Sequence, residues 1–97
     1  MPTYVSLLDW TDKGVVNFKD TVDRYEAARE AAAAKGVIFK DVYWTVGQHD
    51  LVSVVEAPDD ETATAFLLSL AAQGNLRSTT LRAFSADEMR AVIAKSG

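Results

Sequence analysis

Hydrophobic and polar residues alternate with period two over residues 3–10, and strand-like runs return in three later segments. In the first segment the side chains divide into two sets on opposite faces, Val5 and Leu7 against Tyr4, Ser6, Leu8 and Trp10. Both sets are apolar in part, so we expect both faces of this strand to be covered. The later segments are rich in β-branched and aromatic residues, and we expect strands over residues 37–46, 50–56 and 75–84.

Helical spacing fills the intervals between these strands. Thr11 is predicted to be the N-cap of a short helical turn, and a long helix is expected over residues 22–35. A second long helix is expected over residues 58–73, because its acidic start complements the positive end of a helix dipole. Ser85 and Glu88 form a capping box, which predicts a short last helix.

The two middle strands are predicted to form a hairpin. Gly47 lies in the link between them and can supply the positive φ that such a link often requires. The pattern allows a link of two or three residues, and a slip of one residue inverts a strand. The face taken by each residue of 40–46 therefore stays open at the level of sequence.

The element order β-α-β-β-α-β, followed by a last helix, predicts an α+β fold of the ferredoxin-like type, with residues 1–97 as one domain. In this plan both long helices cover one face of the sheet and the other face is bare. A contiguous apolar patch on the bare face could not remain in water, so we expect a second copy to cover it and form a homodimer. The residues expected on the bare face are Leu8, Trp10, Phe39 and Tyr43.

Composition excludes several classes of function. The formal net charge is −4, from 14 acidic and 10 basic residues, so no nucleic-acid partner is expected. Without cysteine there is no disulfide, thiolate nucleophile or thiolate metal site. No stretch approaches the roughly 20 apolar residues of a membrane span, and the start lacks the features of a signal peptide. We therefore expect no membrane partner and a location in the cytoplasm.

Short motifs along nearly the whole chain form a fairly specific combination. They are Tyr-Val-Ser-Leu at 4–7, Trp10-Thr11 with Gly14, Tyr-Trp-Thr-Val-Gly at 43–47, Asp50, Glu-Ala-Pro-Asp-Asp-Glu at 56–61 and Arg-Ser-Thr-Thr-Leu-Arg-Ala-Phe at 77–84. In this combination the chain resembles the GYD-domain family. The family usually has Tyr-Asp after the glycine turn, whereas this chain has His49-Asp50, so a role of that tyrosine hydroxyl does not carry over. The resemblance implies a dimeric α+β barrel of two stacked sheets, often within larger rings, but no established function.

Two wider resemblances bear on function. The Val-Gly-Gln-His-Asp turn at 46–50 is similar to the hairpin of effector-binding domains in the leucine-responsive regulator family, where small molecules bind between subunits. No helix-turn-helix segment accompanies it here, so DNA binding is not implied. Other dimeric α+β barrels include cofactor-independent monooxygenases and haem-degrading enzymes, an analogy of fold alone.

His49 is the only histidine, and histidine normally titrates near neutral pH. It is a candidate general base, and Tyr4 is a second candidate proton handler, although we favour a turn role for His49. A closed metal site requires three or four convergent ligands, and only His49, Asp41 and Asp50 suggest themselves. We therefore predict no metal site and identify no cofactor.

Seven residues are candidates for ligand binding; the alternative is core or interface packing for the aromatic residues, a structural hydrogen bond for the others, and a solvated surface charge for one of the two arginines. The aromatic ones suit a pocket for a flat apolar ligand. Arg77 and Arg82 are five residues apart and so face opposite ways, and the one facing the space between sheets could bind a carboxylate. Asp50 is expected to accept backbone N–H bonds in the turn. The set is Ser6, Trp10, Tyr43, Trp44, Asp50, Arg77 and Arg82.

Two hypotheses from different classes follow. The one we favour is an oligomeric small-molecule-binding module, with a pocket between sheets or at subunit edges and a ligand that the sequence does not identify. The alternative is a small enzyme of monooxygenase or isomerase type that uses His49 or Tyr4 as proton handler. Neither a Ser-His-Asp order, a glycine-rich phosphate loop nor an HExxH motif is present to favour a hydrolase, kinase or metalloprotease.

Overall fold

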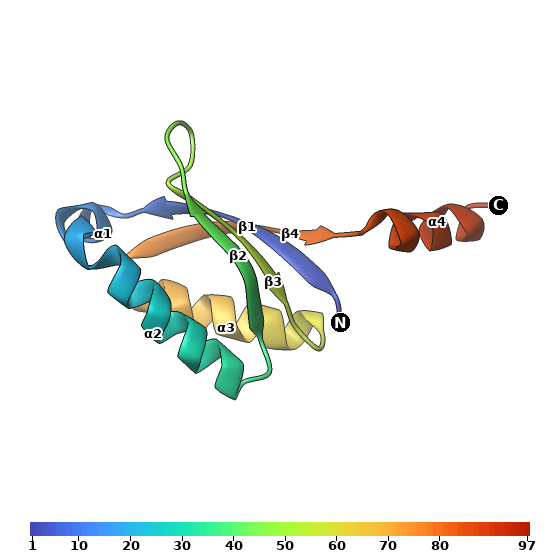
Figure 1. Cartoon of the computed structure of the whole chain (residues 1–97), viewed down its shortest axis with the longest axis horizontal. Helices are drawn as coiled ribbons and strands as arrows, with labels where there is room; N and C mark the ends of the chain where they lie inside the picture. Colours follow the sequence, from blue (N-terminus) through green and yellow to red (C-terminus); the bar gives the residue numbers. More distant parts are fainter.

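Four strands form one antiparallel sheet, and the two long helices lie together on one side of it (Figure 1). The computed structural model describes all 97 residues. The strand order is β2-β3-β1-β4, which is the ferredoxin-like arrangement. The elements are β1 (Thr3–Trp10), α1 (Asp12–Val16), the short 3-10 helix η1 (Phe18–Asp20), α2 (Thr21–Ala34), β2 (Ile38–Trp44), β3 (Leu51–Glu56), α3 (Asp60–Ala72), β4 (Leu76–Ala83) and α4 (Ala86–Lys95).

This architecture confirms the predicted fold class and order of elements, and the predicted strands agree with the observed ones to within two residues at each end. Strand β1 is central and pairs with both β3 and β4. Ser6, in the middle of β1, lies opposite Ser53 on one side and Thr80 on the other. Since side chains alternate along a strand, this register also fixes which residues of all three strands share a face.

A β-bulge in β2 shifts the register of the edge strand. Phe39 pairs with Val55, but the next paired residue, Asp41, lies opposite Val54, so Lys40 is the extra residue. Beyond the bulge, Trp44 returns to the face of Phe39 and Tyr43 takes the other face. The bulge therefore decides which aromatic side chains of β2 meet the helices.

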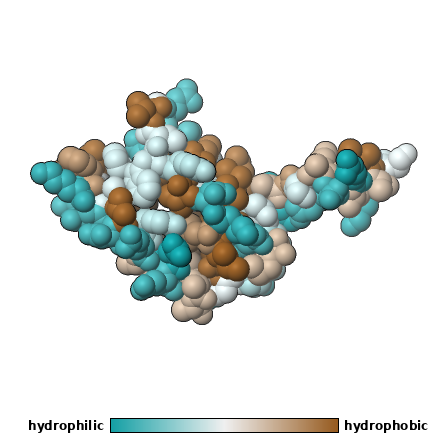
Figure 2. Space-filling view, viewed as in Figure 1, coloured by the Kyte–Doolittle hydropathy of each residue, from teal (hydrophilic) through white to brown (hydrophobic).

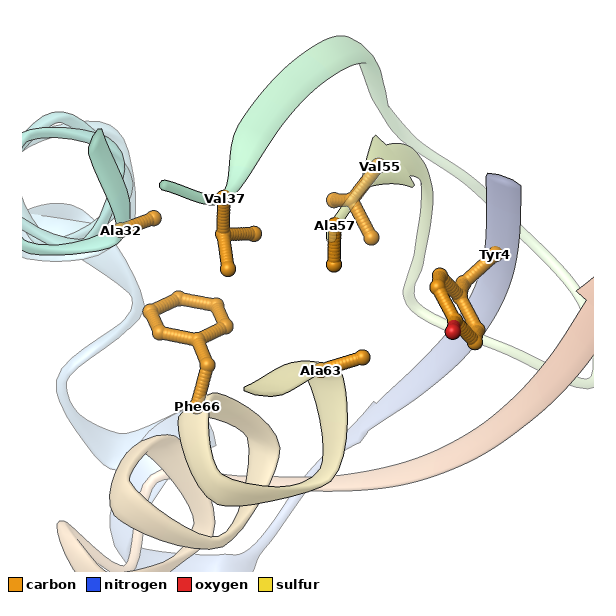
Figure 3. Close-up of a cluster of buried hydrophobic side chains, with 7 residues drawn as sticks. All are labelled: Tyr4, Ala32, Val37, Val55, Ala57, Ala63 and Phe66. Atoms are coloured by element: carbon orange, nitrogen blue, oxygen red, sulfur yellow. The ribbon is translucent and has the colours of Figure 1, made fainter. Parts of the chain in front are cut away.

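The buried core lies between the helix-covered face of the sheet and the two long helices (Figure 3). Figure 3 shows Ala32 from α2 and Phe66 from α3 turned toward the strand side chains. Phe39 of β2 packs against this cluster, with its ring in edge-to-face contact with those of Tyr25 and Phe66 at centroid distances of 5.6 and 5.8 Å. The cluster consists of Tyr4, Ala32, Val37, Val55, Ala57, Ala63 and Phe66.

Three of the four predicted residues of the bare face are in fact on the helix-covered face. Leu8 and Trp10 share the face of Tyr4, and Phe39 packs against the core; only Tyr43 faces away from the helices. Strand β1 carries apolar groups on both faces, and the core uses its larger ones. For β2 the bulge and the loop 45–50, which is longer than the two or three residues expected, set a register that the alternation pattern did not reveal.

Side-chain caps are present at the starts of α1, α3 and α4, whereas no side-chain hydrogen bond caps the start of α2. The Thr11 hydroxyl accepts the Gly14 N–H at the start of α1, and Ser85 and Glu88 form the predicted capping box at the start of α4. The cap of α3 is Asp59, whose carboxylate accepts the Thr62 N–H at 2.8 Å. That hydrogen bond lowers the pKa of the Asp59 carboxyl, because it stabilises the ionised form.

Gly14 marks a close approach between α1 and the segment that precedes β4. A Cβ atom on Gly14 would lie 2.0 Å from the carbonyl oxygen of Asn75. The same carbonyl accepts the Thr11 N–H at 3.1 Å, and the Thr11 hydroxyl donates to the Gly74 carbonyl at 2.5 Å. Glycine is therefore required here for close packing of two backbones rather than for a turn conformation.

Candidate functional site

The sheet face opposite the helices carries two adjacent rows of mostly apolar side chains. The first row, across β4, β1, β3 and β2, is Leu81, Val5, Val54 and Asp41. The second row is Thr79, Leu7, Val52 and Tyr43. The apolar members of both rows are here called the bare sheet face: Val5, Leu7, Tyr43, Val52, Val54 and Leu81.

The bare sheet face is exposed most at its edges, where Leu81 and Tyr43 are 50% and 63% accessible. Four strands about 4.8 Å apart and about seven residues long, at 3.3 Å per residue, give this whole side of the sheet a footprint of roughly 400 Å², and the bare sheet face is its apolar part. Patches of roughly 300–600 Å² are the largest that monomeric proteins usually expose, and they are often functional. Both long helices lie on the opposite side of the sheet, so neither can cover it (Figure 1).

Polar side chains border the bare sheet face at the end near the β2–β3 loop. Asp9 of β1 lies opposite Arg77 of β4, and its Oδ1 is 3.1 Å from Nδ1 of His49 in the loop. Asp50 Oδ2 accepts the backbone N–H of Trp10 at 2.9 Å, which ties the loop to the end of β1. Asp50 thus accepts a backbone N–H as expected, although the donor lies in β1 rather than in the turn. This group of Asp9, His49 and Arg77 is here called the polar rim.

Tyr4 is far from the polar rim, at the other end of β1 and on the helix-covered face. Its hydroxyl donates to the Asp60 carboxylate at the start of α3. Burial, followed by the hydrogen bond to Asp60, raises the pKa of Tyr4 to about 12. A tyrosine with this pKa keeps its proton at neutral pH, and its position separates it from His49.

Ser6 and Arg82 also lie on the helix-covered side and have partners within the chain. The Ser6 hydroxyl is 2.8 Å from that of Thr80. The Arg82 guanidinium lies over the rings of Phe84 and Tyr4, at 4.5 and 5.8 Å from their centroids. Arg82 and Arg77 do face opposite ways, as predicted, and Arg77 is the one on the side of the bare sheet face.

A cavity of about 50 Å³ lies between α2, α3 and the sheet, and is here called the interior cavity. Trp10 is part of its wall, and the indole Nε1 of Trp10 is buried without a hydrogen-bond partner. The corresponding nitrogen of Trp44 is satisfied, since it donates to Thr21 Oγ1 at 3.0 Å. An unpaired buried donor is uncommon and calls for an explanation. The remaining lining residues are Leu8, Thr21, Arg24, Tyr25, Ala28, Phe39, Val42, Leu51, Leu70, Gln73, Asn75 and Leu76.

A groove of about 330 Å³ runs between α2 and α3. It shares Arg24, Ala28, Leu70 and Gln73 with the wall of the interior cavity, so the two spaces adjoin each other. The Arg24 guanidinium donates to the Asn17 carbonyl at 2.8 Å and so holds the start of α2 to η1.

The structure brings the predicted site residues together in two groups rather than one. Tyr43, His49, Asp50 and Arg77 lie on or beside the bare sheet face and its polar rim. Trp10 and Trp44 lie on the helix-covered side, near the interior cavity, while the other three are satisfied elsewhere on that side. No group of three or more histidine, aspartate or glutamate side chains is placed to hold a metal ion. No helix in the structure has the length and apolar character needed to cross a membrane.

Sequence reasoning missed two sets of residues. Asp9 was not predicted to orient His49, because the residues are 40 positions apart and nothing local connects them. Of the bare sheet face only Tyr43 was predicted, and its members on β1, β3 and β4 were missed as well. The signal that could have found them was the alternation of Val5 and Leu7 in β1, which the register extends to Val54 and Val52.

The fold and these sites define a small ferredoxin-like domain with one helix-covered and one bare apolar sheet face. Residues 4–93 match the GYD domain, and the chain belongs to that family. The "Glutamine synthetase and cystathionine beta-lyase binding protein" of Thermus thermophilus is 34% identical over 84 residues, which cover 86% of this chain and 88% of that protein. The crystal structure of TTHA0845 from the same organism is similar with a TM-score of 0.55 and 28% identity, over 89% of this chain and 96% of that one.

Proposed function

We propose that this protein is a binding module that works as a pair of copies stacked through the bare sheet face, and that the pair binds another protein. The bare sheet face is the observation that supports pairing, because its two rows together place at least one apolar side chain on each of the four strands. The relative from T. thermophilus is named for binding two enzymes. A protein partner of that kind, an enzyme, is what we propose for this chain, with the cytoplasm as its predicted location.

Stacking two copies suits the chemistry of this face. Two sheets packed face to face lie about 10 Å apart, with the side chains of both inner faces filling the space. The apolar rows would form the dry centre, and the polar rim of Asp9, His49 and Arg77 would lie at the edge. Charged groups at an edge contribute more to the choice of orientation than to affinity.

The binding function is tested with the two enzymes named for the relative. Glutamine synthetase and cystathionine β-lyase from the source organism of this chain are purified and mixed with it, and complexes are detected by size-exclusion chromatography with light scattering. We expect a stable complex with at least one of them. Failure of both enzymes to bind at micromolar concentration would contradict the proposed protein partner. The Ala65→Lys variant, on the exposed surface of α3, serves as a control for a change of charge.

A second candidate function, small-molecule binding, is favoured by the unpaired Trp10 N–H in the wall of the interior cavity. A neutral, largely apolar molecule with one hydrogen-bond acceptor would satisfy that donor while its body contacted Tyr25 and Phe39. The cavity of about 50 Å³ accommodates a small group, and the adjoining groove offers room for the rest of the molecule. The ligand would then lie under the helices, not between the sheets.

Native and denaturing mass spectra of protein purified without added ligand test this second function. We expect the natural protein to have a higher mass in the native spectrum than in the denaturing spectrum. We expect the Trp10→Phe variant to show no such difference. Identical masses under both conditions would contradict a retained ligand. In that case water is the occupant of the cavity, since about 10–15 Å³ of such space holds one molecule.

The enzymatic alternative depends on His49. A carboxylate beside an imidazole orients the ring, as in the arrangement of a general base, and Asp9 supplies that carboxylate at 3.1 Å. Tyr4 lies on the opposite face of the sheet and keeps its proton at neutral pH, so it does not complete a pair with His49. We rank this alternative below the two binding functions.

A further inference from the structure

Helix α4 extends away from the rest of the molecule as an arm, here defined as residues 84–95. Figure 1 shows it beyond the end of β4, with the C-terminus at the far tip and no other element beside it. None of its residues is buried. The arm gives the chain a longest dimension of 50 Å and a radius of gyration of 14.5 Å, against about 12.5 Å for a compact chain of this length.

A helix as short as this one requires more than its own local interactions. Isolated helices shorter than about 12–15 residues are marginal in water. The arm has ten helical residues, a capping box, and an ion pair between Arg90 and Asp87 at 2.5 Å. Such surface interactions favour the helix only modestly, and most helical stability in proteins comes from packing of an apolar face. The arm therefore lacks its main source of stability within a single copy.

The arm has an apolar stripe that is suited to such packing. Met89, Val92 and Ile93 follow the i, i+3, i+4 spacing of one helix face. They are 46%, 40% and 58% exposed, and the charged residues lie mainly on the other side of the helix. Figure 2 shows hydrophobic surface near the outer end of the arm, where nothing else in the chain approaches it.

The base of the arm is held so that it cannot fold back freely onto its own sheet. The Arg82 guanidinium lies over the ring of Phe84 and is 3.9 Å from the Glu88 carboxylate. Glu88 also accepts the Ser85 N–H at 2.8 Å. These contacts join the end of β4 to the first turn of α4 and set the direction in which the helix leaves the sheet.

We propose that the apolar stripe of the arm packs against a second copy of this chain, the copy that covers the bare sheet face. The proposal rests on the pairing in the proposed function. The arm continues β4, whose residue Leu81 belongs to the bare sheet face, so the two surfaces are contiguous along the chain. The whole side of the sheet that holds the bare sheet face has a footprint of roughly 400 Å², about half of the 800 Å² per partner that a standard interface buries. The arm supplies the area that the sheet alone lacks.

Sedimentation velocity at 1–50 µM, roughly the range in which standard protein pairs associate, tests the arm with a matched pair of variants. Ile93→Lys places a charge on the stripe, and Ala94→Lys places the same charge on the opposite side of the helix; lysine is a good helix former in both. We expect Ile93→Lys to raise the dimer dissociation constant at least tenfold and Ala94→Lys to leave it within about twofold. Far-UV circular dichroism on dilution should show loss of helix content as the pair separates.

The variant Leu81→Lys, in the exposed edge strand of the bare sheet face, separates this proposal from the pairing itself. Dissociation by Leu81→Lys without any effect of Ile93→Lys would overturn the role of the arm and leave the sheet interface standing. A dimer unaffected by either change would overturn both. A wild-type arm that keeps its full helix content in a separated monomer would also overturn the proposal, because the arm would then need no partner.

Discussion

The close approach at Gly14 allows a prediction whose sign distinguishes packing from helix propensity. Gly14 lies inside α1, where alanine is favoured over glycine by about 1 kcal/mol. A Cβ atom there would be 2.0 Å from the Asn75 carbonyl oxygen and 2.9 Å from its carbon, so the two backbones must separate by roughly 1 Å. The variant Gly14→Ala therefore gains helix propensity, but its new methyl group clashes with main-chain atoms, which cannot move aside as the end of a flexible side chain could.

The separation would break interactions whose sizes can be estimated. It lengthens the Thr11 N–H bond to Asn75, now 3.1 Å, and the Thr11 hydroxyl bond to Gly74, now 2.5 Å. Each contributes about 0.5–1.5 kcal/mol, and overpacking typically costs about 1–3 kcal/mol. Together these costs amount to about 2–6 kcal/mol, and after the gain in propensity of about 1 kcal/mol is subtracted we expect Gly14→Ala to lower the free energy of unfolding by about 1–5 kcal/mol, and the melting temperature by at least several degrees.

Urea denaturation at one fixed protein concentration measures this effect, since association makes stability depend on concentration. Ala65→Gly, at an exposed position inside α3, calibrates propensity alone and should cost about 1 kcal/mol. A Gly14→Ala variant as stable as the natural protein, or more stable, would refute the reasoning, because propensity would then outweigh the close approach.

Three further predictions follow from the side-chain contacts. Tyr4→Phe should lower the free energy of unfolding by about 0.5–1.5 kcal/mol. Because the pKa of Tyr4 is raised from 10.0 to about 12, the natural protein should also lose stability as the pH rises through this window, and the variant should lose less. Urea titrations between pH 8 and pH 12 would show the difference. His49→Ala should change the unfolding free energy by less than about 1 kcal/mol, since its pair with Asp9 is partly exposed, and a larger loss would mean that the pair is structural. Trp44→Phe should lower the free energy of unfolding by about 1 kcal/mol through loss of the hydrogen bond to Thr21. The variant retains Trp10 as its single tryptophan, and the Trp10 fluorescence should stay blue-shifted until the protein unfolds. Red-shifted emission from the folded variant would contradict a buried Trp10 indole.

Much of the fold is determined by local signals that sequence reasoning can detect. The cap at Thr11, the capping box of Ser85 and Glu88, and the runs of β-branched residues located the elements because each acts within a few residues along the chain. Gly14 shows the limit of such reasoning. Its role is the contact with Asn75, 61 residues away in the sequence, which no local pattern indicates.

The sites were harder to predict because they depend on register. The bulge after Phe39 and the loop before Asp50 decide which aromatic side chains face the helices, and both result from packing of the whole sheet. The approach of His49 to Asp9 likewise arises only when the loop meets the end of β1. The order of the elements predicted that one sheet face would be bare, but the alternation pattern did not reveal which residues form it.

The central claim is that the bare sheet face is buried between two copies. Sedimentation equilibrium of the natural protein and of the Val54→Lys variant tests it most directly. In a single copy the new lysine ammonium would lie opposite Asp41, which favours a folded monomer. In the pair the same ammonium would be buried, which disfavours association. The natural protein should sediment with twice its mass of 10.6 kDa, and Val54→Lys should sediment with the mass of one folded chain. Ala65→Lys should behave like the natural protein. A natural protein that remains a well-folded monomer at 50 µM, above the roughly micromolar dissociation constants of ordinary complexes, would contradict the claim.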